Sequence, residues 1–351
     1  MNYDKSILDP QITEITQISV MGVSQTIICV ICVICGSLTC RRRLGGGGFI
    51  RVPIRVHSRL VSAVLNLRAA RPKTGAMPDT EMRVTRLTVY PVKGLAGQPV
   101  DTVEVQDRGL AWDRRWMLVD GDRRFLTQRQ LPKLATIKAA VNAGELVLHH
   151  GVTQMAIPIE PPALAPRIQV IIWRDQVEAV VLPDAGPWLS PILDHRCELV
   201  FMPDTTRRQV NPAFAPAGNI VGFADAYPVL LIGEASLADL NAKLDEAVPM
   251  DRFRPNIVVS SPEPFAEDQW GELEIGTVGL SGAKASARCS VPTVDQLTGE
   301  STGPEPIRTL SRYRRFGTGV YFGQNLIVRQ RGTIGVNDLV VVKSRIDAVY
   351  G

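Results

Sequence analysis

The chain has too little cysteine and histidine for a disulfide framework or a histidine-rich metal site. It holds six cysteines and four histidines in 351 residues, and four of those cysteines lie within residues 29–40. The remaining two, Cys197 and Cys289, are too sparse for a disulfide framework, so a reducing, cytoplasmic location is the simpler expectation. His149 and His150 are adjacent and would face opposite sides of a strand, which makes them poor co-ligands for a metal.

Several short catalytic motifs and a strong charge of one sign are also missing. The sequence has no HExxH, no GxSxG and no phosphate-binding P-loop, and the glycine run at 45–48 follows no predicted strand. The formal net charge is only +4. Residues 1–81 carry ten Lys/Arg against five Asp/Glu, which leaves 29 against 30 in the rest of the chain. The basic character therefore belongs to the N-terminal segment, and the body gives no reason to expect a nucleic-acid partner.

The N-terminal segment, residues 1–81, is called the extension below, and it lacks an apolar run long enough to span a membrane comfortably. Its tight apolar run covers residues 27–35, inside a looser stretch at 18–40, whereas a spanning helix needs about 20 mostly apolar residues. If the stretch inserts, the arginines at 41–43 would hold its C-terminal side in the cytoplasm. Membrane contact is therefore expected only through residues 18–40. A membrane-anchored protein with a cytoplasmic body is the alternative to a cytoplasmic one.

Two other interpretations of the extension remain open. The four cysteines of residues 29–40 have a spacing near that of a ferredoxin-type iron–sulfur site. The Val and Ile residues between the first three resist the turns that a cluster loop needs, which disfavours this interpretation. The favoured interpretation is that residues 1–81 are a disordered segment outside the working protein, with Met77 or Met82 as a start just ahead of the first convincing strand.

The body, residues 82–351, alternates apolar and polar positions over short segments, as half-buried strands do. The first such segment is 82–95, which turns at Pro91 and Gly94. Further strands are expected at 100–105, 114–120, 123–128, 136–141, 145–150, 169–173 and 177–182, and later at 256–260, 270–276, 278–289, 320–330 and 338–344. Because no helical pattern intervenes before about residue 185, the first half predicts a β-barrel or sandwich.

Two segments of the second half predict helices. Residues 235–248 place leucines on one face, and Ser236 is positioned to cap the start of this helix. Residues 305–315 predict a second helix. The expected fold class is therefore α+β and predominantly β, with a β-barrel-like domain over residues 82–200 and a mixed, β-rich domain over 201–351.

Cys289 is the residue of the body best suited to chemistry. It follows an expected strand and precedes a loop that contains Pro292 and Gly299. The guanidinium of Arg288 beside it favours a thiolate, which is a nucleophile or a soft metal ligand. A buried, inert cysteine is the alternative that these residues alone leave open.

Arginines cluster in short motifs along the body. They occur at 114–115, 129, 207–208, 252 and 254. If these side chains converge on one site, they would suit a phosphate or another polyanion, and a solvated surface is the ordinary alternative. Arg254 fits the surface alternative least, because Pro255 and Asn256 lead into a strand that is expected to be buried.

Nine short motifs in a fixed order cover most of the body. They are YPVKG (90–94), DRRW (113–116), TQRQ (127–130), FADAYP (223–228), SLADLN (236–241), RFRPN (252–256), FAEDQW (265–270), ARCSVPTVDQLTG (287–299) and YFGQN (321–325). Together they resemble the MOSC superfamily, and within it the proteins with an N-terminal MOSC β-barrel domain. That group includes the mitochondrial amidoxime-reducing component and its bacterial relatives, and the resemblance covers residues 82–350.

The resemblance implies a molybdenum–molybdopterin cofactor and an oxidoreductase that reduces N-hydroxylated or N-oxide compounds. Cys289 would be both the metal ligand and the catalytic residue. The resemblance further implies that the pterin and its phosphate are held by Lys93, Arg114, Arg254, Asn256 and Arg288, and that Asp225, Phe322, Gly323 and Gln324 are further walls of the pocket. Molybdenum cycles between oxidation states and can accept an oxygen atom from an N–O group, and a thiolate ligand tunes its potential.

Two departures from the family pattern affect this implied pocket. Gly94 and Ala287 stand where the family often has serine, so each lacks a hydroxyl that could reach the cofactor. No cysteine follows Cys289 to form the C-terminal ferredoxin domain of some relatives, so a separate ferredoxin- or cytochrome-type electron donor is expected. MOSC domains also occur joined to cofactor sulfurases, and a cofactor or sulfur carrier without reductase activity is therefore the alternative function.

Overall fold

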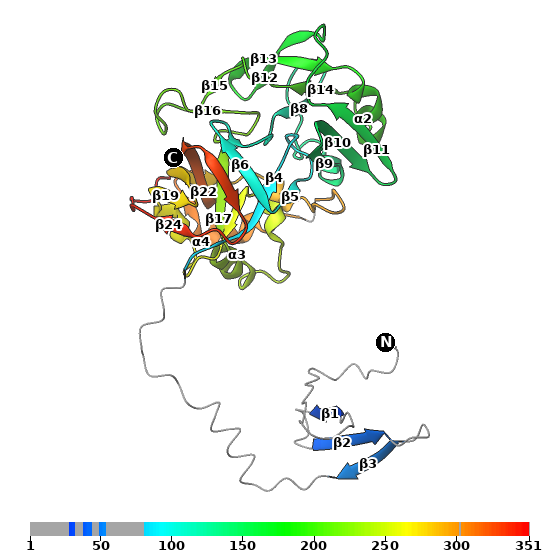
Figure 1. Ribbon diagram of the computed structural model, residues 1–351, viewed down its shortest axis with the longest axis vertical. Helices are drawn as coiled ribbons and strands as arrows, with labels where there is room; N and C mark the ends of the chain where they lie inside the picture. Colours follow the sequence, from blue (N-terminus) through cyan, green and yellow to red (C-terminus); the bar gives the residue numbers. More distant parts are fainter. Residues whose placement is uncertain (1–27, 32–37, 44–48, 54–80, 302, 351) are drawn as a thin grey trace. The chain divides into compact units, whose positions relative to one another are not determined.

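The computed structural model describes residues 28–31, 38–43, 49–53, 81–301 and 303–350, and the chain divides into two compact units, Met1–Pro78 and Asp79–Gly351 (Figure 1). In the first unit an antiparallel sheet runs in the order β1 (Ile28–Ile31), β2 (Leu38–Arg43), β3 (Phe49–Pro53). Cys32, Cys35 and Met77 lie outside the described residues. The role of the extension therefore stays a prediction. Among the residues that the structure describes, no helix is long and apolar enough to cross a membrane.

We expect a protein begun at Met82 to fold and to retain the implied cofactor as well as the full chain does. Such a protein loses the ion pair of Glu81 with Arg83, whose side chains are 62% and 45% exposed, and exposed pairs contribute little stability. It keeps the carbonyl of Met82, which accepts a hydrogen bond from the Val340 N–H at 2.7 Å. Thermal unfolding, molybdenum content and membrane partition of the two proteins test this. Loss of cofactor from the shorter protein would show that the extension belongs to the working structure, and membrane recovery of the longer protein alone would support an anchor.

The second unit is built mainly of strands, as the sequence predicts, and its largest sheet has nine of them. The order is β24-β19-β20-β22-β17-β18-β4-β5, with β21 paired to β22, and the β17–β18 pair is parallel. These strands are β4 (Val84–Val89), β5 (Gln98–Val100), β17 (Val229–Gly233), β18 (Ile257–Val259), β19 (Glu272–Ile275), β20 (Val278–Ala287), β21 (Arg315–Phe316), β22 (Gly319–Gln330) and β24 (Val340–Val342).

Smaller sheets run in the orders β12-β13-β14-β8, β11-β10-β9, β23-β6-β7 and β15-β16. Their strands are β6 (Thr102–Gln106), β7 (Gly109–Leu110), β8 (Trp116–Val119), β9 (Lys138–Asn142), β10 (Glu145–His150), β11 (Thr153–Pro158), β12 (Arg167–Ile172), β13 (Asp175–Leu182), β14 (Glu198–Phe201), β15 (Arg208–Gln209), β16 (Ile220–Val221) and β23 (Gly332–Gly335). Strand β8 is apolar throughout because both of its faces are covered: Trp116 and Leu118 pack into one core, and Met117 and Val119 pack into another.

The first strands of the body pair with strands of its second half. β4 pairs with β18, and β6 pairs with β23. Between β4 and β5 the chain leaves the large sheet, and the Lys93 N–H donates to the Trp116 carbonyl of β8 at 2.8 Å. The YPVKG motif therefore lies at the junction of the large sheet and the sheet that contains β8. The division of the body at residue 200 stays a prediction.

Most expected strands are present with shifted ends. The exception is 123–128, for which a strand was predicted and which makes only isolated bridges at Arg124 and Phe125. This prediction was wrong because the segment leaves a tight turn in which the Asp120 carboxylate accepts the N–H groups of Asp122 and Arg124, both at 2.9 Å.

The helices of the second unit are short, and the described residues also contain single 3₁₀ turns. They are α2 (Ala185–Leu193), α3 (Glu234–Asn241) and α4 (Ile307–Tyr313), with 3₁₀ turns η2 (Pro132–Thr136), η3 (Met250–Phe253), η4 (Ala266–Gln269) and η5 (Val291–Thr293). Helix α4 lies inside the expected segment. Helix α2 was not expected, because Gly186, Pro187 and Pro191 are poor helix residues. It forms because Leu189 and Leu193 are buried in the core.

Helix α3 corrects two predictions. It ends at Asn241 rather than at residue 248, and the Asn241 amide instead closes a loop by hydrogen bonds of 3.0 Å to the N–H and carbonyl of Val248. Leu244 still packs against the core from this loop, which explains why the apolar pattern predicted more helix. Ser236 does not cap the helix, because its buried hydroxyl donates to the Glu267 carboxylate at 2.8 Å.

Candidate functional site

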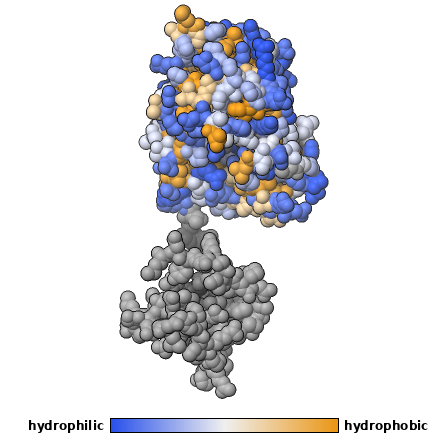
Figure 2. Space-filling view, turned by 90° about the vertical axis from the view of Figure 1, so that its right-hand side faces the viewer, coloured by the Kyte–Doolittle hydropathy of each residue, from blue (hydrophilic) through white to orange (hydrophobic). Residues whose placement is uncertain are grey.

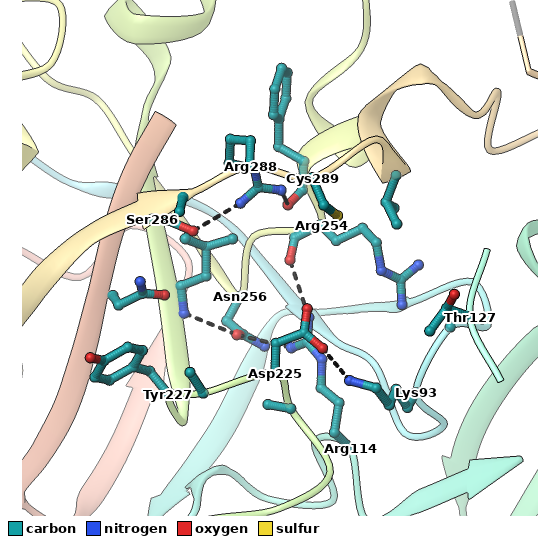
Figure 3. Close-up of a pocket in the computed structure, with 18 of the residues that line it drawn as sticks. Lys93, Arg114, Thr127, Asp225, Tyr227, Arg254, Asn256, Ser286, Arg288 and Cys289 are labelled. Atoms are coloured by element: carbon teal, nitrogen blue, oxygen red, sulfur yellow. Dashed lines mark hydrogen bonds and ion pairs between the residues drawn. The ribbon is translucent and has the colours of Figure 1, made fainter. Parts of the chain in front are cut away.

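A cavity of about 350 Å³ opens beside Cys289, and Figure 3 shows labelled side chains converging on it. Seven of the ten residues predicted for the site line this cavity: Lys93, Arg114, Asp225, Arg254, Asn256, Arg288 and Cys289. They come from five separate stretches of chain, which the topology brings together. Two of these stretches are the turn after β4 and the end of β20.

The other three predicted residues, Phe322, Gly323 and Gln324, do not line the cavity. They lie within β22, where Phe322 and Gln324 are fully buried. Phe322 packs against the cavity-lining Phe253 with ring centres 4.2 Å apart, so it supports a wall of the cavity without reaching it.

Cys289 lies just past the end of β20, in a half-buried position. The preceding N–H, of Arg288, donates to the Val320 carbonyl of β22 at 2.7 Å, which fixes the backbone beside the thiol. In residues 81–301 and 303–350 no group of three or more His, Cys, Asp or Glu side chains is arranged to hold a metal ion. A metal at this thiol would therefore need most of its ligands from outside the described side chains.

Tyr90 stacks between two of the cavity's arginines. The guanidinium carbons of Arg114 and Arg254 lie 4.4 and 4.3 Å from the centre of its ring. Burial raises the pKa of Tyr90 to about 12, although the charges of Arg254 and Arg114 oppose this rise, so the ring is neutral at physiological pH. Such stacking fixes a cation without neutralising it, so the Arg254 guanidinium keeps its charge for a ligand, whereas Arg114 is also paired with the Asp113 carboxylate.

Arg114 and Arg254 share an unusual backbone conformation. Their φ angles are +47° and +56°, in the left-handed region that disfavours residues with a side chain. Pro255 contributes at the second position, because a residue that precedes proline avoids the ordinary helical region. Strain of this kind persists where the surrounding structure enforces it, and it is frequent at functional sites.

A buried carboxylate, Asp113, organises this side of the cavity. It accepts hydrogen bonds from the Tyr90 N–H, the Asn256 amide and the Arg114 guanidinium, at 2.8, 2.8 and 2.6 Å. Burial raises the pKa of Asp113, and the charge and hydrogen bonds of Arg114 oppose that rise. The Asn256 carbonyl oxygen also accepts from Arg114 at 3.0 Å, so Asn256 orients the guanidinium.

Lys93 and Asp225 form an ion pair across the cavity. Burial lowers the pKa of Lys93, and the carboxylate opposes that shift. The surroundings of the pocket raise the pKa of Asp225, and the charge and hydrogen bond of Lys93 outweigh this, so the pKa is low and the carboxylate is ionised. The indole N–H of Trp173 also donates to Asp225, at 3.2 Å.

Positive charge exceeds negative charge in the cavity, and part of it has no partner. Two buried nitrogen atoms, Nη2 of Arg254 and Nε of Arg288, have no hydrogen-bond partner. Burial, with the nearby Arg114 charge, lowers the pKa of Arg254 to about 10, which still leaves a cation at neutral pH. Unpaired buried cationic donors are unfavourable, and an anionic ligand with several acceptor oxygens would satisfy them.

Three other arginines of the sequence motifs, Arg115, Arg208 and Arg252, do not line the cavity, whereas Arg129 does. Arg115 donates to the Met202 carbonyl, and Arg208 binds the Asp175 carboxylate and the carbonyls of residues 222, 224 and 225. Arg252 pairs with Asp295 at 2.8 Å. These side chains hold loops around the cavity rather than facing it.

Sequence reasoning did not assign a role at the site to Tyr90, Asp113 or Trp173. Tyr90 and Asp113 lie in the same motifs as the predicted residues Lys93 and Arg114, which indicated that they are near the site. Their stacking and buried hydrogen bonds cannot be seen in a linear sequence. Trp173 lies outside every matched motif and gave no signal.

The fold and the cavity define a β-rich protein with a cation-lined pocket around one cysteine, and sequence comparison identifies the family. Residues 81–196 match the MOSC N-terminal beta barrel domain, and residues 219–341 match the MOSC domain. The mouse (Mus musculus) mitochondrial amidoxime-reducing component 1 is 34% identical over 292 residues, which cover 78% of this chain and 86% of that protein. The chain therefore belongs to the MOSC family with an N-terminal β-barrel domain.

Two further relatives are similar to this chain to different extents. The mitochondrial amidoxime reducing component 2 of Rattus norvegicus is 32% identical over 293 residues, or 78% of this chain and 87% of that protein. The molybdenum cofactor sulfurase of Solanum lycopersicum is 29% identical over 299 residues, which cover 76% of this chain but 37% of that longer protein. The similarity to the reducing components thus covers most of this chain and most of each of those proteins. The similarity to the sulfurase covers most of this chain but little more than a third of the sulfurase.

Proposed function

We propose that the cavity binds a molybdenum–molybdopterin cofactor through Cys289 and that the loaded protein reduces N-hydroxylated or N-oxide compounds. The observation that carries this proposal is the combination of a half-buried thiol with buried, unpaired guanidinium nitrogens in one cavity. A relative named for amidoxime reduction, similar over most of both chains, supports the substrate class.

The cavity residues fit an anionic pterin cofactor. Arg254 and Arg288 offer unpaired donors for phosphate oxygens, and Lys93 and Arg114, each paired with one carboxylate, add two further cations. The single thiol fits a metal that a bound cofactor would bring with its other ligands, since no side-chain cluster for a metal exists in the described part of the chain. Cys289 would hold the metal, the four cations would hold the pterin and phosphate, and the buried Asn256 would orient Arg114 toward them.

The reaction requires two electrons and two protons for each N–O bond broken, and it yields the reduced nitrogen compound and water. The bound cofactor would supply the redox chemistry, and a separate ferredoxin- or cytochrome-type protein would supply the electrons. The chain's own residues position the reactants: Tyr90 and Asp113 fix Arg114, and the Lys93–Asp225 pair keeps a charged, hydrogen-bonding group at the cavity. A preorganised polar cavity of this kind limits reorganisation during the reaction.

The test is turnover of an amidoxime by the purified, cofactor-loaded protein with reduced methyl viologen as an artificial electron donor. We expect amidine to form in proportion to the molybdenum present. A loaded protein that reduces no amidoxime, N-oxide or hydroxylamine would contradict the reductase.

A second candidate function is a carrier of the cofactor or its sulfur. The similarity to a molybdenum cofactor sulfurase favours this alternative. Tight cofactor binding without N–O reduction, together with transfer of cofactor to an apo-acceptor enzyme, would support the carrier and exclude the reductase.

Replacing Ala287 with serine is expected to slow cofactor loss. The Ala287 side chain is exposed and lines the cavity, so an added hydroxyl meets no packed core and can donate to the anion. A neutral hydrogen bond contributes about 0.5–1.5 kcal/mol, so the variant should release the cofactor about two to ten times more slowly than the parent protein. The matched control is Ala285→Ser on the same strand: Ala285 is fully buried, so its hydroxyl should lower thermal stability without slowing release. Unchanged release from Ala287→Ser would place the cofactor's anionic groups elsewhere.

A further inference from the structure

Trp173 occupies a position that packing alone does not explain. It lies in the tight turn between β12 and β13, with a φ of +56°, where a bulky side chain is disfavoured and glycine is preferred. Its side chain is 44% exposed, so burial recovers only part of the unfavourable backbone conformation. A strained, half-exposed tryptophan is therefore better explained by a function than by stability.

The contacts of Trp173 place it at the rim of the cavity. Its indole N–H donates to Asp225 at 3.2 Å, and the guanidinium carbon of Arg129 lies 4.7 Å from the centre of its ring. Asp225 and Arg129 both line the cavity. Phe125 contacts the indole with ring centres 5.1 Å apart and holds it in this orientation.

Arg129 is fixed in place but not neutralised. Its N–H and Nε both donate to the Thr127 hydroxyl, at 3.2 and 3.5 Å, and its guanidinium lies over the indole. Within residues 81–301 and 303–350 it makes no ion pair with a carboxylate, and its side chain is exposed. Indole and guanidinium together present flat, delocalised surfaces at the rim, the kind on which aromatic rings stack.

We propose that Trp173 and Arg129 form a substrate-recognition wall, which favours N-hydroxylated amidines that carry an aryl group over small N-hydroxylated compounds. This inference rests on the proposed reductase function and names the substrates that the same site prefers. The aryl ring stacks on the exposed part of the wall while the N–O group enters the cavity toward Cys289. A small compound such as hydroxylamine has nothing to place on the wall.

The test compares benzamidoxime with hydroxylamine in the full chain and in Trp173→Ala. Binding of benzamidoxime to the oxidised, cofactor-loaded protein is measured by calorimetry, without electrons and so without turnover, and kcat and KM are measured for both compounds. An aromatic pair contributes enough that its loss should weaken benzamidoxime binding and raise its KM about three- to tenfold. The KM for hydroxylamine and the molybdenum content should stay within about twofold of the parent values.

Two variants separate recognition from structure. Trp173→Phe keeps a ring and should retain most of the preference for benzamidoxime. Trp173→Gly relieves the backbone strain, so its melting temperature should not fall, yet it should lose the preference as fully as Trp173→Ala does. Phe316→Ala, which removes another partly exposed aromatic that does not line the cavity, should leave both KM values unchanged.

Three results would overturn the proposal. One is an equal loss of activity toward benzamidoxime and hydroxylamine in Trp173→Ala, and another is a fall in molybdenum content in that variant. The third is unchanged benzamidoxime binding. A parent protein that reduces neither compound would refute the proposed reductase. The recognition wall would still be tested in that case, because calorimetry measures benzamidoxime binding without turnover.

Discussion

Replacing Cys289 with serine is expected to remove molybdenum from the protein and to leave the fold intact. Serine is nearly the same size as cysteine, but its hydroxyl is a much poorer ligand for a soft metal. Cys289 is half-buried and lies past the end of β20, outside the packed cores, so its replacement should barely change the melting temperature. Activity should fall with the metal. Elemental analysis and thermal unfolding of the purified variant measure both effects.

The control is Cys197→Ser. Cys197 is 3% exposed, and its sulfur lies 3.7 Å from the Ser190 hydroxyl, within the core around α2 and not at the cavity. A serine there keeps a hydrogen-bonding neighbour, so metal content and activity should be unchanged. If Cys289→Ser keeps full metal and activity, or if Cys197→Ser loses them, the metal is not bound where we propose.

Removing Arg254 should weaken cofactor retention strongly. Arg254 offers a buried nitrogen without a partner, and charge-assisted hydrogen bonds to a phosphate contribute about 1.5–3 kcal/mol. We therefore expect Arg254→Ala to raise the rate of cofactor loss about 10- to 100-fold. Pterin and molybdenum remaining after repeated gel filtration would measure this loss.

Two further variants make this test specific. Arg312→Ala removes an exposed arginine of α4 and should leave cofactor content unchanged. Arg254→Gly removes the same side chain as Arg254→Ala but suits the positive φ of this position, so it should lose cofactor without losing stability. Equal cofactor occupancy in Arg254→Ala and Arg312→Ala would show that the arginine does not contact the cofactor.

The sequence predicted the β-rich fold because the strand pattern is local. Alternation of apolar and polar residues identifies a half-buried strand directly, and β10 and β19 were found in this way. Helix α2 was missed because its burial against other elements outweighs the low helix propensity of its glycine and prolines. The end of α3 was missed because the leucine pattern continues to residue 244 and so predicts a longer helix. The helix stops at Asn241, whose amide closes the following loop.

The candidate site was predictable where motifs carried it. Cys289 and the cations around it lie in motifs shared with a known family, and the structure brings them to one cavity. Contacts between distant segments were not predictable. The stacking of Tyr90 between two arginines depends on a loop after β4 and a turn before β18 meeting in space. The same holds for Trp173, which reaches Asp225 from the β12–β13 turn.

Molybdenum and pterin content of the purified full-length protein, expressed in a host that makes the cofactor, tests the central claim most directly. We expect molybdenum and pterin in equal amounts, about one of each per chain, because the cations and thiol of the cavity would hold metal and pterin as one group. A folded protein that contains neither after such expression, and that takes up neither from isolated cofactor, would contradict the account.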